Sequence, residues 1–368
     1  MRYNYLEGLR GYMALWVFFY HASGFLPQAK TQNKFLSFFF DGSLPVIIFI
    51  ILSGFVTHLL LQKNETYFFY LKRRALRLFP IYLICLLISL FLLKFSLHTL
   101  EQIPFEGSKI YGRIKLIETY YNSNKTLNIL SHLTLSHGLF PESRFPFTYT
   151  IMGQSWSLTL EWQFYILIPF LYYFLNKKKV IQNGLIIVLF ILIMLFSKNH
   201  MTQPSFLPNM IIFFLIGYFS MPLFKKFESS NNKYIFIFLS SIALIYCFKN
   251  WMISCLILIW GITLYFQKYK NSFFDILFGG RIIQFLGKIS YSVYCMHMIV
   301  LIILINILQK LEINSVLIFS ISILFGGAFF TILISHLTYR YIELYFIKLG
   351  KTKYDSNLAI KINHYSKD

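Results

Sequence analysis

The stretch EGLRGYMALWVFFYHASGFLP, residues 7–27, decides how the chain folds, because it is apolar enough to enter a lipid bilayer. It nevertheless carries Arg10 near its start and His21 deep inside. A signal peptide would also combine a basic start, an apolar core and small residues, here at positions 22–24. Glu7 in the start and His21 in the core disfavour cleavage, so we interpret the stretch as a retained first membrane helix.

The composition extends this interpretation to the whole chain. Of the 368 residues, 57% are hydrophobic, 20% are aromatic and only 13% are charged, and the mean hydropathy is +0.60. These values exclude an ordinary soluble domain. The net charge of +20 does not indicate a nucleic-acid partner, because the Lys and Arg residues lie in short clusters between apolar runs. The sequence therefore predicts a protein whose surroundings are membrane lipids.

Apolar runs of about 20 residues mark the candidate membrane spans. We predict an all-α, polytopic protein with about ten transmembrane helices. The runs lie near 9–27, 43–62, 78–97, 157–175, 180–197, 206–223, 234–249, 251–267, 288–309 and 314–337.

The distribution of basic residues predicts the orientation. Most of the 34 Lys and Arg residues fall in segments that are cytoplasmic if both termini are inside. We therefore expect a membrane-embedded domain over residues 1–347, with an external segment at about 98–156, and a polar, basic cytoplasmic tail over 348–368.

Arg10 and His21 lie on one stripe of the first helix, since 11 positions correspond to about three turns and about 16 Å of rise. They cannot touch, but they can face one cavity. An ionisable side chain inside a bilayer usually faces the bundle interior or a water-filled path, which makes His21 a functional candidate. The alternative is a neutral imidazole that only hydrogen-bonds to a neighbouring helix.

The block YFFYLKRRALRLFPIY, residues 67–82, places Arg74 and Arg77 three positions apart, along one edge of a helix. Arginine binds phosphate groups through two parallel hydrogen bonds, so the cluster suits a polyphosphorylated ligand. The alternative is an ordinary basic anchor that contacts lipid headgroups.

Three further segments contribute candidate residues. Ser157, Glu161 and Tyr165 share one face of a helix, and burial near the bilayer would let Glu161 act as an acid, as a base or as a partner for a histidine. The alternative is a helix cap formed by a serine with a carboxylate in the first turns. His297 follows Tyr294 by three residues in an otherwise apolar helix, and Glu343 closes the last predicted helix, where a solvated glutamate would be ordinary.

No metal site is predicted. His132 and His137 are five positions apart, which is poor spacing for two ligands on one helix, and the four cysteines show no CxxC spacing. We also expect no permanently bound cofactor.

Together these blocks resemble the acyltransferase-3 family of integral membrane O-acyltransferases, from residue 7 to about residue 346. The matching pieces are LEGLRGYMALWVFFYH, FIILSGF, RRALRLFPIY, WSLTLEWQFY, LGKISYSVYCMH and YIE, in this order. Some relatives carry an additional extracytoplasmic hydrolase-like domain, whereas this chain resembles a stand-alone membrane domain.

The resemblance implies a bacterial cytoplasmic-membrane enzyme that moves an acyl group, usually acetyl from acetyl-CoA or another acyl-CoA, to a hydroxyl of a surface or exported glycan or a lipid-linked saccharide. His21 then matches the essential histidine and Arg10 its paired arginine, while Arg74 and Arg77 match the Arg-x-x-Arg motif. Glu161 and Glu343 fall on the motif acids, and YIELYF lacks the proline that follows the acid in many relatives.

On this basis His21 and Glu161 are the predicted catalytic residues, with Arg10, Arg74 and Arg77 holding acyl-CoA. Supporting roles are expected for Ser157, Tyr165, His297 and Glu343. Direct transfer and a covalent relay through His21 remain open, as does a role of Glu161 as the partner that orients His21. A glycan-lipid flippase or another transporter is the competing function, with His21 and Glu161 on a proton path.

Overall fold

The computed structural model describes residues 3–27, 38–63, 65–103, 108–176, 192, 193, 195, 197, 200–230, 239–244, 250–269 and 272–351. These residues are predominantly helical and contain no β-strand. The long helices are α1 (Asn4–Ser23), α3 (Ser43–Leu61), α4 (Tyr67–Phe91), α8 (Trp156–Asn176), α10 (Leu207–Ser230), α12 (Trp251–Lys268) and α14 (Arg281–Lys310). The all-α prediction is confirmed for this part of the chain.

The last helical run, Val316–Lys351, is continuous but not uniform. It consists of α15 (Val316–Ile321), a π-helical turn η3 (Ser322–Gly326), α16 (Gly327–Thr338) and a second π-helical turn η4 (Tyr339–Glu343) before its final turns. Single π-turns insert an extra residue and re-aim the side chains that follow. Glu343 ends such a turn, so it lies inside the helix and not at its end, where the sequence had placed it.

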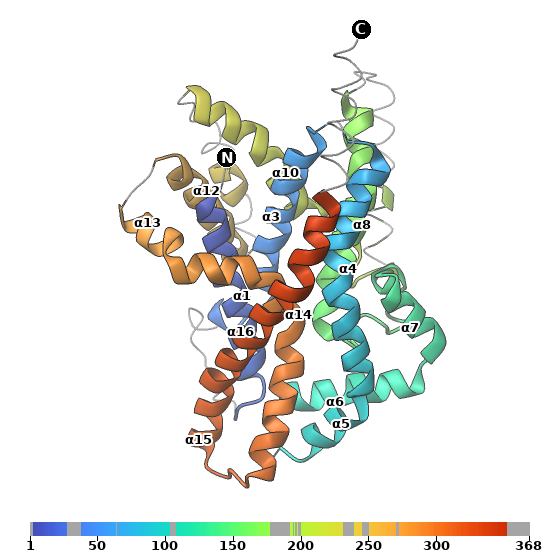
Figure 1. Cartoon of the computed structure of the whole chain (residues 1–368). Coiled ribbons are helices and arrows are strands. Elements are labelled where there is room, and N and C mark those ends of the chain that lie inside the picture. Colours follow the sequence, from blue (N-terminus) through green and yellow to red (C-terminus); the bar gives the residue numbers. More distant parts are fainter. Residues whose placement is uncertain are drawn as a thin grey trace.

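Shorter helices cluster at the lower end of the molecule in Figure 1 and form the segment predicted to be external. They are α5 (Leu93–Glu101), α6 (Ser108–Asn122), α7 (Lys125–Leu133) and the 3-10 turns η1 (His137–Leu139) and η2 (Gly153–Ser155). The short helix α13 (Ser272–Gly279) precedes α14 toward the opposite end (Figure 1).

Six helices among the described residues are long and apolar enough to cross a membrane: α3, α4, α10, α12, α14 and the run Val316–Lys351. The predicted spans 9–27 and 157–175 coincide with α1 and α8, which have the length but carry more polar side chains. The predicted spans 180–197 and 234–249 fall largely outside the described residues. The count of ten and the placement of the termini in the cytoplasm therefore stay predictions.

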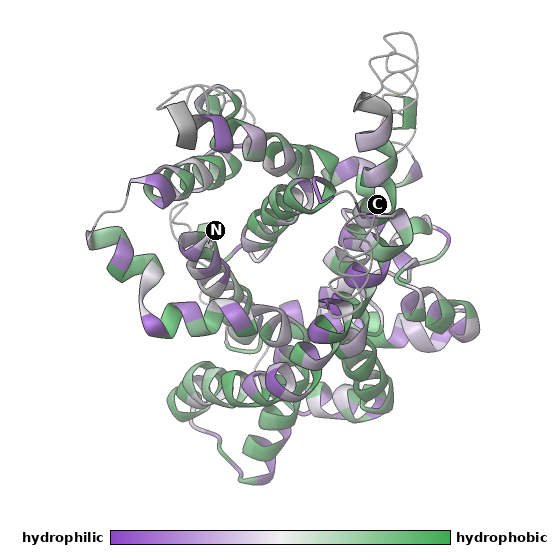
Figure 2. Ribbon diagram, turned by 45° about the horizontal axis from the view of Figure 1, so that its top comes forward, coloured by the Kyte–Doolittle hydropathy of each residue, from purple (hydrophilic) through white to green (hydrophobic). Residues whose placement is uncertain are grey.

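The surfaces of these helices suit a lipid environment. Large apolar side chains are exposed: 87% of the surface of Phe91, 69% of Leu317 and 66% of Phe325. In the most apolar 18-residue stretch of Val316–Lys351, only 22% of the residues are buried in the protein. Figure 2 shows apolar residues along most of the ribbons, with polar residues on shorter stretches. Such side chains are stable only where lipid, and not water, surrounds them. The chain is accordingly a multi-pass membrane protein.

Two helix pairs pack closely enough to exclude side chains at their crossings. A Cβ on Gly287 of α14 would meet the carbonyl oxygen of Glu7 on α1, and a Cβ on Gly217 of α10 would meet the carbonyl oxygen of Ile51 on α3, both inside contact distance. Small residues at such crossings allow close backbone approach between membrane helices. The pair α1 and α14 carries His21 and His297, so this contact fixes how the two histidine-bearing helices meet.

Candidate functional site

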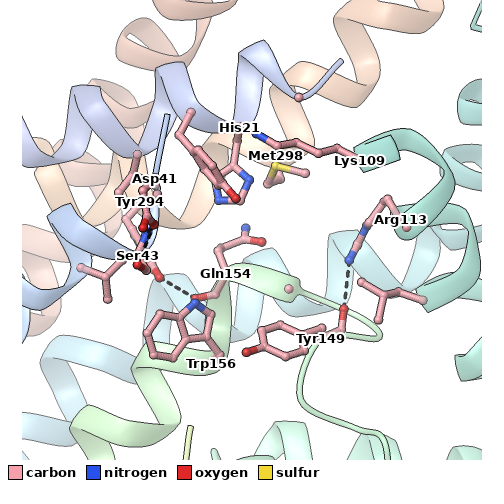
Figure 3. A pocket seen from close by; sticks show the side chains of 18 of the residues that line it. His21, Asp41, Ser43, Lys109, Arg113, Tyr149, Gln154, Trp156, Tyr294 and Met298 are labelled. Carbon is pink, nitrogen blue, oxygen red and sulfur yellow. Dashed lines mark hydrogen bonds between the residues drawn. The ribbon is translucent and has the colours of Figure 1, made fainter. Parts of the chain in front are cut away.

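His21 occupies the last turn of α1 and lines a cavity of about 710 Å³. The walls come from α1, from the start of α3, from α6, from the segment 149–156 and from α14. We call this space the outer cavity. Figure 3 shows His21 in it, with Lys109 and Arg113 on one side and Asp41 and Tyr294 on the other. A volume of this size is in the range that holds small organic ligands.

His297 lies beside His21. The centroids of the two rings are 5.0 Å apart and the ring planes are inclined by 40°. His297 is fully buried, and its Nδ1 lies 3.1 Å from the carbonyl oxygen of Val293. A carbonyl oxygen can only accept, so Nδ1 carries the proton and Nε2 keeps a free lone pair. Nε2 is buried without a hydrogen-bond partner among the described residues, which leaves a base beside His21.

Two basic residues of α6 stand over the same cavity. The Nζ atom of Lys109 lies 4.0 Å from the centroid of the Tyr20 ring, and burial lowers the pKa of this ammonium group. Arg113 donates to the carbonyl oxygens of Tyr149 and Ile151, both at 3.0 Å, and burial lowers its pKa to about 10. Arg113 therefore holds the segment that forms the opposite wall and still carries its charge at neutral pH.

A second, inner cavity of about 50 Å³ lies further along α1. Its lining includes Arg10, Arg77, Glu161 and Ser53. The Glu161 carboxylate accepts hydrogen bonds from the hydroxyl of Ser53 at 2.6 Å and from that of Tyr165. The Nε atom of Arg10 is buried with no partner among the described residues, so one arginine donor in this cavity is free for a ligand.

Two further predicted residues, Arg74 and Glu343, lie outside the lining of the inner cavity and interact with groups next to it. Arg74 is 6% exposed and its guanidinium lies 4.8 Å from the centroid of the Tyr165 ring. Glu343 is 3% exposed and accepts a hydrogen bond of 2.8 Å from Ser292. Both Glu343 and Glu161 interact electrostatically with Arg77. The alternatives stated from the sequence, a solvated carboxylate for Glu343 and a helix-capping carboxylate for Glu161, do not describe these contacts.

Tyr294 on α14 lines both cavities and separates them. Its hydroxyl donates to the carbonyl oxygen of Gln154 at 2.6 Å and lies 2.7 Å from the hydroxyl of Ser157, which can donate to it (Figure 3 shows the first bond). A buried tyrosine normally pairs its hydroxyl in this way. The predicted supporting residue Ser157 thus acts on Tyr294 rather than on His21.

The structure brings the predicted residues into two groups. Arg10, Arg77 and Glu161 lie together in the inner cavity, while His21 and His297 meet in the outer one. Arg10 and His21 were expected to face one cavity, and they face adjoining cavities with Tyr294 between them. Glu161 contacts Ser53 and Tyr165, and its electrostatic neighbours are the arginines, so the structure gives His21 a histidine neighbour instead of this carboxylate.

Sequence reasoning missed Lys109, Arg113, Gln154 and Trp156. Their one available signal was the spacing of Lys109 and Arg113, four positions apart on one face of a helix in a segment predicted to be external. External basic residues depart from the usual charge bias of membrane proteins.

The described residues contain no group of three or more His, Cys, Asp or Glu side chains that could hold a metal ion. His132 and His137 instead stack with ring centroids 4.1 Å apart and planes inclined by 10°, and the hydroxyl of Ser155 lies 3.3 Å from Nε2 of His137. Burial lowers the pKa of His132 to about 4, and lowers that of His137, where the neighbouring His132 adds to the effect. The pair is neutral at physiological pH and supports the segment that precedes α8.

Comparisons with known proteins place the chain in a family. A search of curated proteins and a search of solved structures gave no match. A family model described as an acyltransferase domain matches residues 3–340, nearly the whole chain. The match spans α1 through the start of η4, and so includes both cavities and every residue that lines them. The chain belongs to the acyltransferase-3 family of membrane acyltransferases.

Proposed function

We propose that the protein transfers an acetyl group from acetyl-CoA to a hydroxyl of a cell-surface or exported glycan, at the cytoplasmic membrane of a bacterium. Family membership supports an acyl transfer, and the observation that carries the proposal is the arrangement of the two cavities. A small cavity lined by Arg10 and Arg77 adjoins a large one that contains two neighbouring histidines. This order suits an anionic donor on one side of His21 and a saccharide on the other.

The donor is assigned to the inner cavity because its phosphates need cationic donors. Arg10 has a free Nε, and Arg77 lines the same space. Arginine is the side chain best suited to phosphate. The rise of about 16 Å from Arg10 to His21 along α1 would let the pantetheine arm reach the histidine while the nucleotide stays outside the bilayer. Arg74, packed on Tyr165, stabilises this region from behind.

The inner cavity must widen to admit the arm, since about 50 Å³ is far below the volume of a ligand pocket. Tyr294 is the side chain that closes the way between the cavities, and two hydrogen bonds hold it there. We expect donor binding to displace its ring.

At the reaction centre His21 removes the proton from the acceptor hydroxyl as the oxygen attacks the thioester carbonyl carbon. The carbon–sulfur bond then breaks, and the thiolate of CoA takes the proton from the His21 imidazolium, which gives the ester and free CoA. A two-step route, in which His21 carries the acetyl group on a ring nitrogen, uses the same neighbours. His297 is placed to orient His21 in either route, because its free Nε2 can accept a hydrogen bond from the His21 ring.

Glu161 has a different role in this scheme from the one expected at first. Its carboxylate stands among Arg10, Arg77, Ser53 and Tyr165, so it positions the arginines of the donor site. Glu343 does the same for Arg77. Both remain site residues, and both act through the donor.

The test is label transfer from acetyl-CoA into the surface glycan of the host, with membranes that contain the protein, lack it, or contain His21→Ala at equal abundance. His98 is an exposed histidine of α5 and provides a matched control, His98→Ala. We expect incorporation that depends on the protein, falls by about 10²- to 10⁴-fold in His21→Ala and is unchanged in His98→Ala. Equal incorporation in all membranes, with other acyl-CoA donors also inactive, would overturn the proposal.

The competing transporter function predicts movement of a glycan-lipid across the membrane without acyl-CoA. Family membership does not favour it. Glycan-lipid movement that persists without acyl-CoA and depends on His21 would restore it.

A further inference from the structure

The outer cavity has an excess of positive charge that the transfer reaction by itself does not need. We propose that the acceptor saccharide carries an acidic group, a carboxylate or a phosphate, which binds between Lys109 and Arg113. This inference rests on the proposed function for the identity of the reaction, but it concerns only what the outer cavity binds.

The two cations point to one place. Lys109 and Arg113 lie four residues apart on α6, and both line the outer cavity beside His21 (Figure 3). Lys109 is fixed over the Tyr20 ring and against the backbone of Gly24, where a Cβ would come within 3.0 Å of the lysine side chain. Both cations interact electrostatically with His21. A ligand held by them therefore has the reacting histidine within reach.

The acidic side of the cavity is already engaged. Asp41 is the one acidic residue in the described lining, and its Oδ1 accepts from the backbone N of Ser43 at 2.8 Å and from the Ser43 hydroxyl at 2.6 Å. Asp41 interacts electrostatically with Lys109, but the two form no ion pair within 4 Å among the described residues. Asp41 thus holds the start of α3, and its charge is shared with the backbone there.

Arg113 lacks an acidic partner altogether in the described part of the chain. Its hydrogen bonds go to two carbonyl oxygens, which orient the guanidinium but do not neutralise it. No acidic residue contributes to the electrostatics of Arg113, since burial alone accounts for its lowered pKa. A buried cation without a counter-charge is costly, and an anionic ligand would remove that cost.

The cavity also has the shape and walls for a sugar. Its volume of about 710 Å³ accommodates a mono- or disaccharide, and Tyr20, Tyr149 and Trp156 present aromatic rings to it. Rings of this kind pack on the C–H faces of sugars, while the cations fix the acidic group. The proposed donor site has its own arginines, Arg10 and Arg77, in the inner cavity, so the α6 cations are left for the acceptor.

The first experiment measures binding without any donor, on the full-length protein in lipid nanodiscs. The probes are methyl glucoside, methyl glucuronide and methyl glucoside 6-phosphate, which share a ring and differ in charge at C6. The variants are Lys109→Gln and, as a matched control, Lys115→Gln, an exposed lysine on the same helix. We expect at least tenfold tighter binding of an acidic probe than of the glucoside, as is typical of a hydrogen-bonded charge. The stronger of the two acidic probes identifies the acid as carboxylate or phosphate.

The expected preference falls several-fold in Lys109→Gln and is retained in Lys115→Gln. Equal affinity for all three probes in the wild type, or a preference that Lys109→Gln leaves unchanged, overturns the inference. So does a loss of CoA affinity in Lys109→Gln that equals the loss for the acidic probes, because the cations would then belong to the donor.

The second experiment measures acetyl transfer from acetyl-CoA to cellobiose and to its uronic acid, which keeps one primary hydroxyl. We expect the wild type to have a lower KM for the uronic acid than for cellobiose. In Lys109→Gln the KM for the acid should rise to the value for cellobiose while kcat stays nearly unchanged, which supports a binding role. Faster or equal transfer to cellobiose overturns the inference but leaves the transferase standing. Absence of acetyl transfer to any glycan counts against the proposed function alone, because the binding preference was measured without a donor.

Discussion

Arg77 interacts electrostatically with two acidic residues, and removing it should cost stability in a way that a second substitution reverses. Glu343 and Glu161 both interact with Arg77 electrostatically. Glu343 is 3% exposed and has the Ser292 hydroxyl as its recorded hydrogen-bond donor. Leaving a buried polar group without its compensating partner typically costs about 1 to 3 kcal/mol, and loss of the Arg77 charge leaves the Glu343 carboxylate in this position. Arg77→Gln should therefore destabilise the protein by about this amount.

The two acids differ in how much they depend on Arg77. Glu161 is partly exposed and keeps two hydroxyl donors, Ser53 and Tyr165, whereas Glu343 keeps one. The double variant Arg77→Gln/Glu343→Gln should recover at least half of the lost stability, and Arg77→Gln/Glu161→Gln should recover less. Neither should recover affinity for acetyl-CoA, because the cationic group that we assign to the donor is still missing.

The assay measures unfolding of the purified protein in nanodiscs, together with acetyl-CoA binding. It compares the wild type, the single variants Arg77→Gln, Glu343→Gln and Glu161→Gln, and the two double variants. The double-mutant cycle isolates the pairwise energy between Arg77 and each acid. Arg73→Gln provides a control for loss of an arginine, since Arg73 pairs with Glu65 outside the inner cavity. A cost below about 0.5 kcal/mol for Arg77→Gln, or a double variant no more stable than the single one, would refute the reasoning.

Three shorter predictions concern other parts of the structure. Gly217→Ala should lower the unfolding midpoint in nanodiscs, since the added Cβ meets the Ile51 carbonyl oxygen, whereas Gly112→Ala, in open space on α6, should not. Tyr294→Phe removes the two hydrogen bonds of the side chain that separates the cavities, and we expect the free energy of unfolding to fall by about 1 to 3 kcal/mol. We also expect a higher rate of acetyl-CoA hydrolysis, measured without acceptor. The pKa of His132 in the folded state lies near 4, below its ordinary value of about 6.5, so the unfolded chain binds more protons between these two pH values. The contribution of His132 to stability is therefore full above pH 6.5 and is lost as the pH drops toward 4. A pH series of unfolding midpoints should show this slope, and His132→Gln should flatten it; an unchanged slope would contradict the assignment.

The membrane character and most helix positions followed from apolar length alone. The run 43–62 became α3 and the run 288–309 became most of α14, because a bilayer demands continuous internally bonded helices. The ends were harder to place. α4 starts at Tyr67, not near 78, because the arginine-rich block continues the helix, and Arg74 and Arg77 are consequently inside the bundle. Periodicity gives the face of a residue but not how deep a neighbouring helix will cover it.

The sequence predicted which residues belong to the site better than it predicted which of them lie next to one another. Arg10, His21 and Glu161 could be named from ionisable groups in apolar surroundings and from the family resemblance, yet their partners depend on contacts between distant segments. Tyr294 meets Gln154 across 140 positions, and Ser292 meets Glu343 across 51. The π-turn that ends at Glu343 re-aims this side chain, and no sequence period signals it. The α6 cations were overlooked because an external lysine and arginine resemble ordinary solvated charges until a cavity is seen beneath them.

The division into two cavities changes how the first helix is understood. Arg10 and His21 on one stripe of α1 need not share a ligand-binding space, because Tyr294 from α14 closes the path between them. Only a ligand that is long, anionic at one end and reactive at the other would contact both, and acyl-CoA has this form. With this division Glu161 and Glu343 lie on the arginine side, while His21 has a histidine as its neighbour. A carboxylate next to His21 would partly offset the charge of Lys109 and Arg113, and the outer cavity would lose the positive field on which the proposed recognition of an acidic acceptor depends.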